Sequence, residues 1–371
     1  MRASQAERER LRADFVRLCE IPSPSRRERA AADYVTAELG LEVSEDSSAS
    51  ATGADAGNLY ARIPAPDGAP TILFCAHLDT VPLTGPIEVS EADGRFTNRY
   101  QAILGADNKA AVAAFMGVAR RFAGESPVGI EFLFTTCEER ALAGAKAFDR
   151  AQLAAAFGFV FDHASPIGEL IVAAPSYFRV EAEVHGRAAH AGIRPEDGRS
   201  AIVAAAGALG RMELGRIDPE TTANAGRIEG GTAANVVAER CRLELEARSI
   251  DPDKATRTVE RMVDALADAA SETECDVETQ VEEQFRAYRM PRGAPPVAAA
   301  AAALAELGME PQYVTTGGGS DANVFNAAGL PCLNVANGTA QNHEPDESVT
   351  VEALETALDV ALTLVGCSAS R

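Results

Sequence analysis

The sequence predicts an α/β protein in which a mostly parallel β-sheet carries helices on both faces and is interrupted by an inserted α+β domain. From residue 71 to about residue 162, short apolar runs typical of strands alternate with helical patterns. This order gives a parallel sheet covered by helices. Between about residues 176 and 288 the order becomes strand, helix, strand, strand, helix, strand, which is typical of a ferredoxin-like domain.

The elements of the sheet domain follow one another in the first part of the chain. The runs expected to form strands are TILFCAH (71–77), GIEFLFTTCEE (129–139) and FGFVFD (157–162). Between them lie two alanine-rich helical patterns, NKAAVAAFMGVARRFAG (108–124) and AGAKAFDRAQLAAA (143–156). Ligand chemistry in such sheets gathers at the carboxyl ends of the strands, so these ends are the first place to look for function.

The inserted segment is predicted to contain alternating, half-exposed strands and two helices. Its expected elements are YFRVEAEVHG (177–186), a helix over 198–214, AGRIEGG (225–231), AERCRLELEARSI (238–250), a long helix after residue 252, and CDVETQVEEQF (275–285). It therefore has the element order of a self-contained domain.

The α/β pattern resumes after Pro291, with an alanine-rich helix near residues 296–307 and a final helix over residues 351–365. The first domain is therefore expected to be discontinuous. The predicted boundaries are residues 1–175 and 290–371 for this domain and residues 176–289 for the insert.

Composition limits the classes of partner. The chain has 371 residues, of which 46% are hydrophobic, and this is enough for a large core. A formal net charge of −21 disfavours nucleic acids and anionic membranes, because their phosphates would be repelled. The seven cysteines include no CxxC pair, so neither a disulfide framework nor a thiolate zinc site is indicated. The sequence has no signal-like apolar segment, and we expect a cytoplasmic protein.

Carboxylates and imidazoles gather where the predicted strands end and where the first of the two helices begins. The side chains concerned are His77, Asp79, Asp107, Glu138, Glu139 and Asp162. Because the carboxyl ends of parallel strands meet at one sheet edge, these groups should share one cleft. So much negative charge in one place is unfavourable unless cations neutralise it.

A second imidazole, His343 in GTAQNHEPDE, lies close to the end of the last apolar run. Two histidines and several carboxylates without cysteine suit a pair of divalent ions such as zinc, cobalt or manganese. On this interpretation His77 binds metal and Asp79 holds its other ring nitrogen. Plain structural roles stay open for single residues: His77 as a hydrogen-bonded strand end, Asp107 as a helix N-cap, and Asp162 as a turn cap.

An ordered series of segments resembles the dinuclear-metal aminoacylase/carboxypeptidase group of metallopeptidases, in its peptidase T-like branch. The segments span nearly the whole chain: IPSPSRRERAAADYV, GNLYARIP, CAHLDTVP, ILGADNKAAVAA, TTCEER, GELIVAAPS, HGRAAHAG, GGTAANVV, GGGSDANVFNAAGLPCLNV and HEPDE. The resemblance implies a phosphorylase/hydrolase-like catalytic domain, a ferredoxin-like lid that also mediates dimerisation, and a homodimer.

The resemblance also implies a metal-binding role for each matching position. His77 and Asp162 would hold one ion, and His343 and Glu139 would hold the other. Asp107 would bridge the two ions. Zinc is the expected metal, with cobalt or manganese as alternatives.

Three further positions match residues that act on the substrate. Glu138 resembles the general base, with Asp79 beside it in the catalytic set. His190 in RAAHAG resembles a histidine that reaches into an active site, typically that of a partner subunit, and Asn235 in TAANVV resembles a substrate-binding asparagine. Candidates to bind a substrate carboxylate, each equally open to a plain surface role, are Arg248, Arg286 and Arg289.

The predicted activity is metal-dependent hydrolysis of amide bonds in small peptides, by a tripeptidase- or aminopeptidase-like exopeptidase. Glu138 would take a proton from water and pass it to the leaving amine. An N-acyl-amino-acid deacylase, a dipeptidase or a carboxypeptidase is the alternative, because the same centre cleaves these amides. A catalytically silent homologue that binds metal or peptide is a third possibility. Asn108 and Arg140 depart from the family's usual pattern beside predicted ligands.

Overall fold

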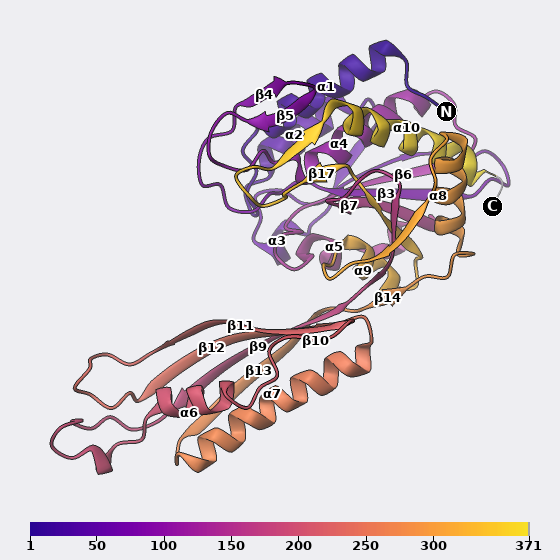
Figure 1. Ribbon diagram of the computed structural model, residues 1–371. Coiled ribbons are helices and arrows are strands. Elements are labelled where there is room, and N and C mark those ends of the chain that lie inside the picture. The colour runs from indigo at the N-terminus through magenta and orange to yellow at the C-terminus, as the bar shows by residue number, and fades with distance from the viewer. Residues whose placement is uncertain (370–371) are drawn as a thin grey trace. The chain divides into compact units, whose positions relative to one another are not determined.

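The protein is described by a computed structural model that covers residues 1–369 of the chain. The chain divides into two compact units (Figure 1). The first, which we name the α/β unit, comprises Met1–Ala173, Met290–Thr315 and residues 320–369. The second, the inserted unit, comprises Ala174–Arg289 and the short segment Thr316–Gly319.

The α/β unit is built on a mixed sheet with a parallel centre. Its strand order is β1-β2-β6-β3-β7-β16-β8, with β15 paired to β8. Strand β3 pairs in parallel with both β6 and β7, and β16 pairs in parallel with β7. The strands are β1 (Val43–Glu45), β2 (Leu59–Ile63), β3 (Thr71–His77), β6 (Gly129–Thr135), β7 (Phe157–His163), β8 (Glu169–Ala174), β15 (Gln312–Thr315) and β16 (Cys332–Ala336).

The central strands are buried along almost their whole length, as expected where helices cover both faces of a sheet. Phe74 on β3 lies at the middle of the core, with its ring centroid 4.9 Å from that of Phe115 and 5.8 Å from that of Phe159. Such aromatic pairs contribute about 0.5–1.5 kcal/mol each beyond their buried area. The predicted α/β fold class is confirmed.

Eight α-helices of this unit surround the sheet. They are α1 (Gln5–Cys19), α2 (Arg29–Glu38), α3 (Ala49–Thr52), α4 (Ala106–Phe122), α5 (Ala143–Ala147), α8 (Pro295–Glu306), α9 (Asp321–Ala327) and α10 (Val351–Ser368). The helix predicted over residues 143–156 is wrong beyond Ala147. There the backbone of Phe148 becomes extended, and the Asp149 carboxylate accepts from the Ala151 amide to start a short 3-10 turn, Arg150–Gln152.

A small antiparallel sheet completes the unit, in the order β17-β18-β5-β4. Its strands are β4 (Val89–Ala92), β5 (Arg95–Asn98), β17 (Thr339–Ala340) and β18 (Ser348–Thr350). The segment between β17 and β18 carries His343. Among residues 1–369, no helix has both the length and the apolar composition needed to cross a membrane.

The inserted unit is an antiparallel sheet in the order β10-β11-β12-β9-β13, with α6 and α7 packed on one face (Figure 1). Its elements are β9 (Ser176–His185), α6 (Ala201–Leu209), β10 (Gly215–Asp218), β11 (Thr221–Gly230), β12 (Arg240–Ser249), α7 (Pro252–Glu272) and β13 (Asp276–Phe285), followed by the two-residue strand β14 (Tyr288–Arg289). The predicted ferredoxin-like order is present, with β10 as an additional strand.

The two helices of the inserted unit begin at side-chain caps. Asp251 accepts from the amides of Asp253 and Lys254 at the start of α7. Ser200 accepts from the Val203 amide at the start of α6. Helix α6 is therefore shorter than the 198–214 predicted, because it begins after this cap and stops at Leu209.

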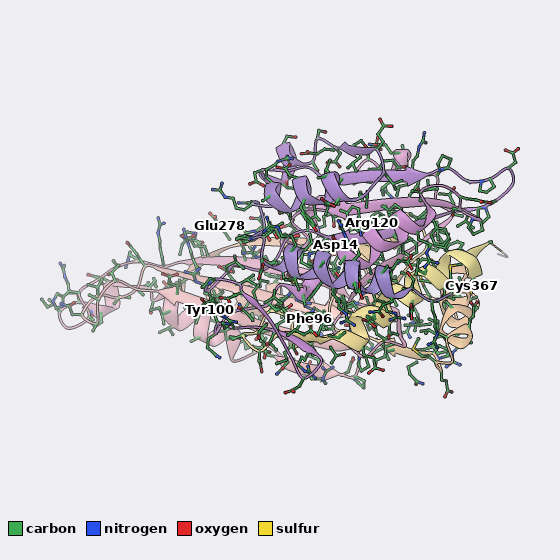
Figure 2. All side chains as sticks on the ribbon, turned by 90° about the horizontal axis from the view of Figure 1, so that it is seen from above. Asp14, Phe96, Tyr100, Arg120, Glu278 and Cys367 are labelled. Atoms are coloured by element: carbon green, nitrogen blue, oxygen red, sulfur yellow. The ribbon has the colours of Figure 1, made fainter. Side chains whose placement is uncertain are left out.

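A buried carboxylate ties three helices of the α/β unit together. Asp14 on α1 accepts from Arg120 of α4 at 2.6 Å and from the Tyr34 hydroxyl of α2 at 2.8 Å. Arg10 adds a contact at 3.1 Å. Figure 2 labels Asp14 and Arg120 in this cluster. Burial, followed by the hydrogen bond to Asp14, raises the pKa of Tyr34 to about 12.

Replacing Asp14 with alanine should lower the free energy of unfolding by about 3 kcal/mol, because the partly buried Arg120 guanidinium loses its carboxylate. The matched control is Asp33→Ala, since Asp33 is exposed and forms only a 3.3 Å pair with Arg29. That change should cost less than about 1 kcal/mol. Urea unfolding followed by circular dichroism measures both. Equal losses for the two variants would contradict the importance of the Asp14 cluster.

Candidate metal centre

The parallel pairing of β3 with β6 and β7 brings the ends of three strands together. His77 is the last residue of β3 and pairs in register with Thr135, the last residue of β6. Glu138 and Glu139 follow β6 after two residues, and Asp162 is the penultimate residue of β7. The strand-end residues named from the sequence therefore do lie at one edge of the sheet.

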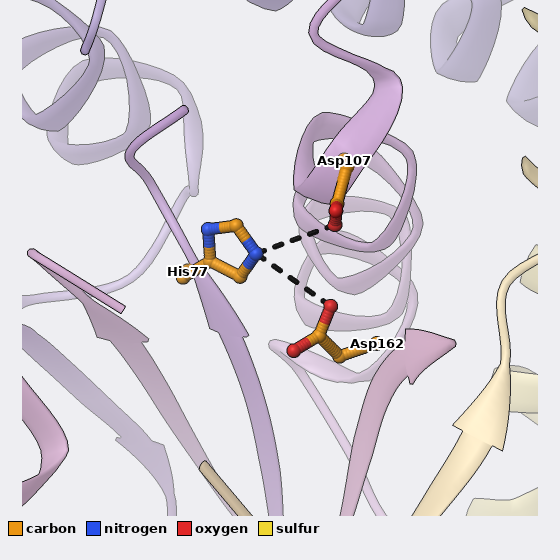
Figure 3. Close-up of side chains that lie close together, drawn as sticks. All are labelled: His77, Asp107 and Asp162. Atoms are coloured by element: carbon orange, nitrogen blue, oxygen red, sulfur yellow. Dashed lines mark ion pairs between the residues drawn. The ribbon is translucent and has the colours of Figure 1, made fainter. Parts of the chain in front are cut away.

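Asp107 lies between two imidazoles. Its Oδ1 atom is 3.3 Å from His77 Nε2, and its Oδ2 atom is 3.2 Å from His343 Nε2. His77 Nε2 also lies 3.6 Å from Asp162 Oδ1 (Figure 3), and His343 Nε2 lies 2.8 Å from Glu139 Oε1. One carboxylate thus offers one oxygen to each of two histidine-carboxylate groups.

Glu347, a buried residue just before β18, holds the backbone of the segment that carries Asp107. Its carboxylate accepts from the amides of Gly105 and Asp107, at 2.8 and 2.9 Å. Gly105, with φ of +76°, is the N-cap of α4 and has no side chain with which to cap it, so the Glu347 carboxylate accepts from the first turn instead. Asp107 lies two residues after the N-cap, and its carboxylate faces the histidines.

Asp162 and His77 are also oriented by neighbours. The Asn334 side chain accepts from the Asp162 amide and donates to its carbonyl, each at 3.0 Å. The Nδ1 atom of His77 lies 3.0 Å from the backbone oxygen of Asp79 and 3.4 Å from its carboxylate. The carbonyl of Asp79 is thus the nearer partner of the ring.

The Asp79 carboxylate has its own partners. It is fully buried and accepts from the amides of Glu138 and Glu139, at 2.9 and 3.2 Å, and from Ser25 Oγ at 2.7 Å. Burial alone would raise the pKa of Asp79, but the contact with His77 and these donors lower it. Asp79 therefore stays ionised while it holds the amides of Glu138 and Glu139.

Three other groups of the cluster have raised pKa values. Burial and the nearby Asp107 raise the pKa of Asp162 to about 7. Burial, followed by Asp162, raises the pKa of Glu138 well above its usual range. Hydrogen bonds to Asp107 and Glu139 raise the pKa of His343 to about 10. The cluster thus resists carrying its full negative charge.

These residues fit a pair of divalent cations. Two sets of three ligand atoms, each within 4.8 Å of one another, share Asp107: one set adds His77 and Asp162, and the other adds Glu139 and His343. Within the described chain, the buried Oδ1 of Asp107 has no hydrogen-bond partner. Nitrogen and oxygen donors without thiolates are the set that zinc, cobalt or manganese accepts.

The other predicted site residues belong to the inserted unit. His190 and Asn235 are both exposed, and their segments pair: the Ala191 amide donates to the Asn235 carbonyl at 3.0 Å, and His190 bridges with Val236. The three predicted arginines already bind carboxylates of their own unit. The pairs are Arg248 with Glu246, Arg286 with Glu283, and Arg289 with Glu220.

Sequence reasoning missed several residues that support the centre. Besides Glu347, these include the fully buried Lys109, which donates to Ser23 Oγ and to the Leu78 carbonyl. Burial lowers the pKa of Lys109 to about 8. Only tertiary contact reveals these partners, because Glu347 lies 240 residues along the chain from Asp107.

Comparison with known proteins gives a consistent result. The family model described as peptidase family M20/M25/M40 matches residues 73–366. The uncharacterized protein YqjE of Bacillus subtilis is 36% identical over 361 residues, covering 96% of this chain and 97% of the relative.

Two solved structures are similar along nearly their whole length. The crystal structure of aminopeptidase PepT from Bacillus cereus has a TM-score of 0.89 at 37% identity and covers 98% of this chain and 99% of that one. A tripeptidase from Staphylococcus aureus has a TM-score of 0.92 at 32% identity, with the same two coverages.

Proposed function

Because this chain belongs to peptidase family M20/M25/M40, we propose that it is a tripeptidase- or aminopeptidase-like exopeptidase that hydrolyses amide bonds in small peptides. Membership in this family makes the protein a hydrolytic enzyme. The observation that carries the proposal is the pair of histidine-carboxylate groups that share Asp107. The similarity to an aminopeptidase and a tripeptidase along almost the whole chain favours short peptides as substrates.

The proposed cofactor is a pair of divalent ions, zinc or alternatively cobalt or manganese. His77, Asp162 and one oxygen of Asp107 would hold one ion. His343, Glu139 and the other oxygen of Asp107 would hold the second. When bound, such ions polarise the scissile carbonyl and bring the pKa of water from 15.7 to about 7.

Glu138 is the proposed general base. One ligand atom each of His77, Glu138 and Glu139 lie within 4.8 Å of one another, so the Glu138 carboxyl is close to both proposed ion sites. Its raised pKa favours uptake of a proton from water. The same carboxyl would then release the proton to the leaving amine.

His190 is the proposed donor to the carbonyl oxygen of the substrate. The Gly192 amide donates to His190 Nδ1 at 3.2 Å, which leaves Nε2 to carry the proton of the ring. A proton at Nε2 suits hydrogen bonding to an oxygen that gains negative charge. Asn235, on the segment paired with His190, is the proposed substrate-binding amide.

A homodimer formed through the inserted unit completes the proposal. Strand β10 pairs only with Thr221–Ala223 of β11, so the remainder of β11 forms an open edge in the chain as described. The inserted unit also exposes large apolar side chains, including Val203, which is 60% exposed, and Ile193, which is 70% exposed. These features favour association with a second copy.

A panel of substrates tests the activity. We expect ion-loaded protein to hydrolyse unblocked tripeptides faster than dipeptides and N-acyl amino acids, as measured by release of free amine. Preference for N-acyl amino acids would instead indicate a deacylase with the same centre. No hydrolysis of any member would support a silent homologue.

Glu138→Gln should reduce kcat by about 100- to 10,000-fold, because it removes the base while keeping the side chain's size. The content of bound metal should stay close to that of the unchanged protein, measured by elemental analysis. Full activity in this variant would contradict the role of Glu138.

Zinc titration of metal-free protein should show about two ions bound per chain, with net release of about two to three protons at pH 7. The sign follows from the raised pKa values: His343, with a pKa of about 10, and His77, whose pKa the nearby carboxylates raise well above its usual range despite burial, are protonated at pH 7 and must lose their protons to bind. Asp162, with a pKa of about 7, loses a further fraction. Affinity should therefore rise with pH.

Calorimetry in buffers of different ionisation enthalpy measures this proton release. Asp107→Ala should weaken binding of both ions, because Asp107 faces both histidines. Asp67→Ala, which changes an exposed carboxylate elsewhere in the unit, is the matched control and should bind normally. Loss of only one ion in Asp107→Ala would contradict the bridging role.

Mixing inactive His190→Ala with inactive Glu138→Gln chains tests a site shared across the dimer. If His190 serves its partner's centre, a mixed dimer contains one complete site and the mixture recovers about a quarter of the original activity. The control mixture, Glu138→Gln with His343→Ala, should stay inactive, because each chain's own centre is damaged. Verified mixed dimers that remain inactive would show that His190 acts within its own chain.

A further inference from the structure

The segment that follows β6 is held by side chains instead of by a strand partner. The four successive amides of Thr136–Glu139 donate in order to Asn58 Oδ1 at 3.0 Å, Glu28 Oε1 at 3.0 Å, Asp79 Oδ1 at 2.9 Å and Asp79 Oδ2 at 3.2 Å. Buried amides need acceptors, and here three side chains distant in sequence supply all four. The path of this segment is therefore set by those acceptors.

The same turn has a backbone that few side chains adopt. Cys137, Ala141 and Leu142 have φ values of +52°, +59° and +63°, although none is a glycine. Non-glycine residues persist in this region only when their surroundings over-determine them, and such residues cluster at functional sites. Cys137 stands directly before Glu138, so its conformation sets the direction in which Glu138 leaves the backbone.

Glu28 is the acceptor that holds Cys137. It is completely buried, and its Oε1 atom accepts from the Cys137 amide at 3.0 Å, from the Cys137 thiol at 3.4 Å and from the Arg26 amide at 2.9 Å. Its other oxygen has no hydrogen-bond partner within residues 1–369.

The position of Glu28 in α2 makes this arrangement informative. Glu28 is the N-cap residue of α2, where a carboxylate would ordinarily accept from the first turn of its own helix, but it makes no such bond. Its carboxylate binds Cys137 instead. A cap of α2 is therefore not the reason for burying this acid.

We propose that Glu28 is a positioning residue for Glu138: by accepting from the Cys137 amide, it fixes the strained turn that aims the Glu138 carboxyl at the centre. The inference rests on the proposed function, in which Glu138 is the general base. Asp79 holds the next two amides but also contacts His77, so its loss would disturb ion binding as well. Within residues 1–369, Glu28 forms no hydrogen bond or ion pair with a proposed ligand, so variants of Glu28 test positioning separately from ion binding.

Two variants of Glu28 and one control test the proposal with the ion-loaded protein. Glu28→Ala removes the acceptor, whereas Glu28→Gln keeps an oxygen acceptor and the size of the side chain. The control is Glu131→Ala near the start of β6: Glu131 is also buried and accepts from the amides of Ala154 and Ala155, both at 2.9 Å. It holds a different turn, away from the candidate centre.

We expect Glu28→Ala to lower kcat by about 100-fold, because a displacement of about 1 Å in a catalytic group costs that much. KM and the number of bound ions should stay unchanged. Glu28→Gln should recover most of the lost kcat. Glu131→Ala should lower the melting temperature as much as Glu28→Ala does, yet keep kcat within about threefold of the original, because it leaves the geometry of the centre intact.

The outcomes separate failure of this inference from failure of the proposed function. If Glu138→Gln is inactive but Glu28→Ala keeps its kcat, Glu28 does not position the base. The same conclusion follows if Glu131→Ala loses as much kcat as Glu28→Ala, or if Glu28→Ala loses bound ions. If Glu138→Gln itself remains active, the role of Glu138 fails first, and the positioning role of Glu28 fails with it.

Discussion

The structure depends on holding several acidic side chains close together at one edge of a buried sheet. Asp107, Asp162 and Glu138 would repel one another if all were ionised in this environment. Burial, followed by this repulsion, raises the pKa values of Asp162 and Glu138. Cations would relieve it, and the two imidazoles, each near a different oxygen of Asp107, mark the proposed binding positions. The fold thus creates a binding energy for metal by concentrating like charges.

Chemically identical groups acquire different roles because their surroundings differ. Asp79 is fully buried and the side chain of Asp162 is 9% exposed, but His77, two amides and a serine hydroxyl contact the Asp79 carboxylate, so its pKa falls while that of Asp162 rises. Hydrogen bonds to the charged form favour ionisation, and burial without such donors opposes it. Environment, and not residue type, separates a permanent anion from a carboxyl that exchanges protons.

The sequence predicted the parts of the centre that follow from strand order, because parallel strands necessarily end at the same edge. His77, Glu138 and Asp162 come directly from that rule, and His343 was predicted from its place close to the end of the last apolar run. The sequence could not predict the role of Glu28, because an acid at the start of a helix is ordinarily a solvated cap. Glu347 and Asn58 were missed for a second reason: their partners are backbone amides of distant loops, and no spacing in the sequence records them. Helix lengths also failed where a side-chain cap, such as that of Ser200, decided the boundary.

The division of the chain into two units also divides the proposed chemistry. All the proposed metal ligands belong to the α/β unit, so the proposed ion site includes no side chain of the inserted unit. The residues proposed to handle substrate, His190 and Asn235, belong to the inserted unit, where both are exposed. The predicted substrate-binding arginines of this unit differ in the number of partners that they already have. Arg248 makes two bonds to Glu246 and stacks on Tyr177, whereas Arg289 makes a single pair with Glu220. A guanidinium has five donors, so Arg289 keeps more of them for a substrate carboxylate, and Arg248 would first have to give up partners that already orient it.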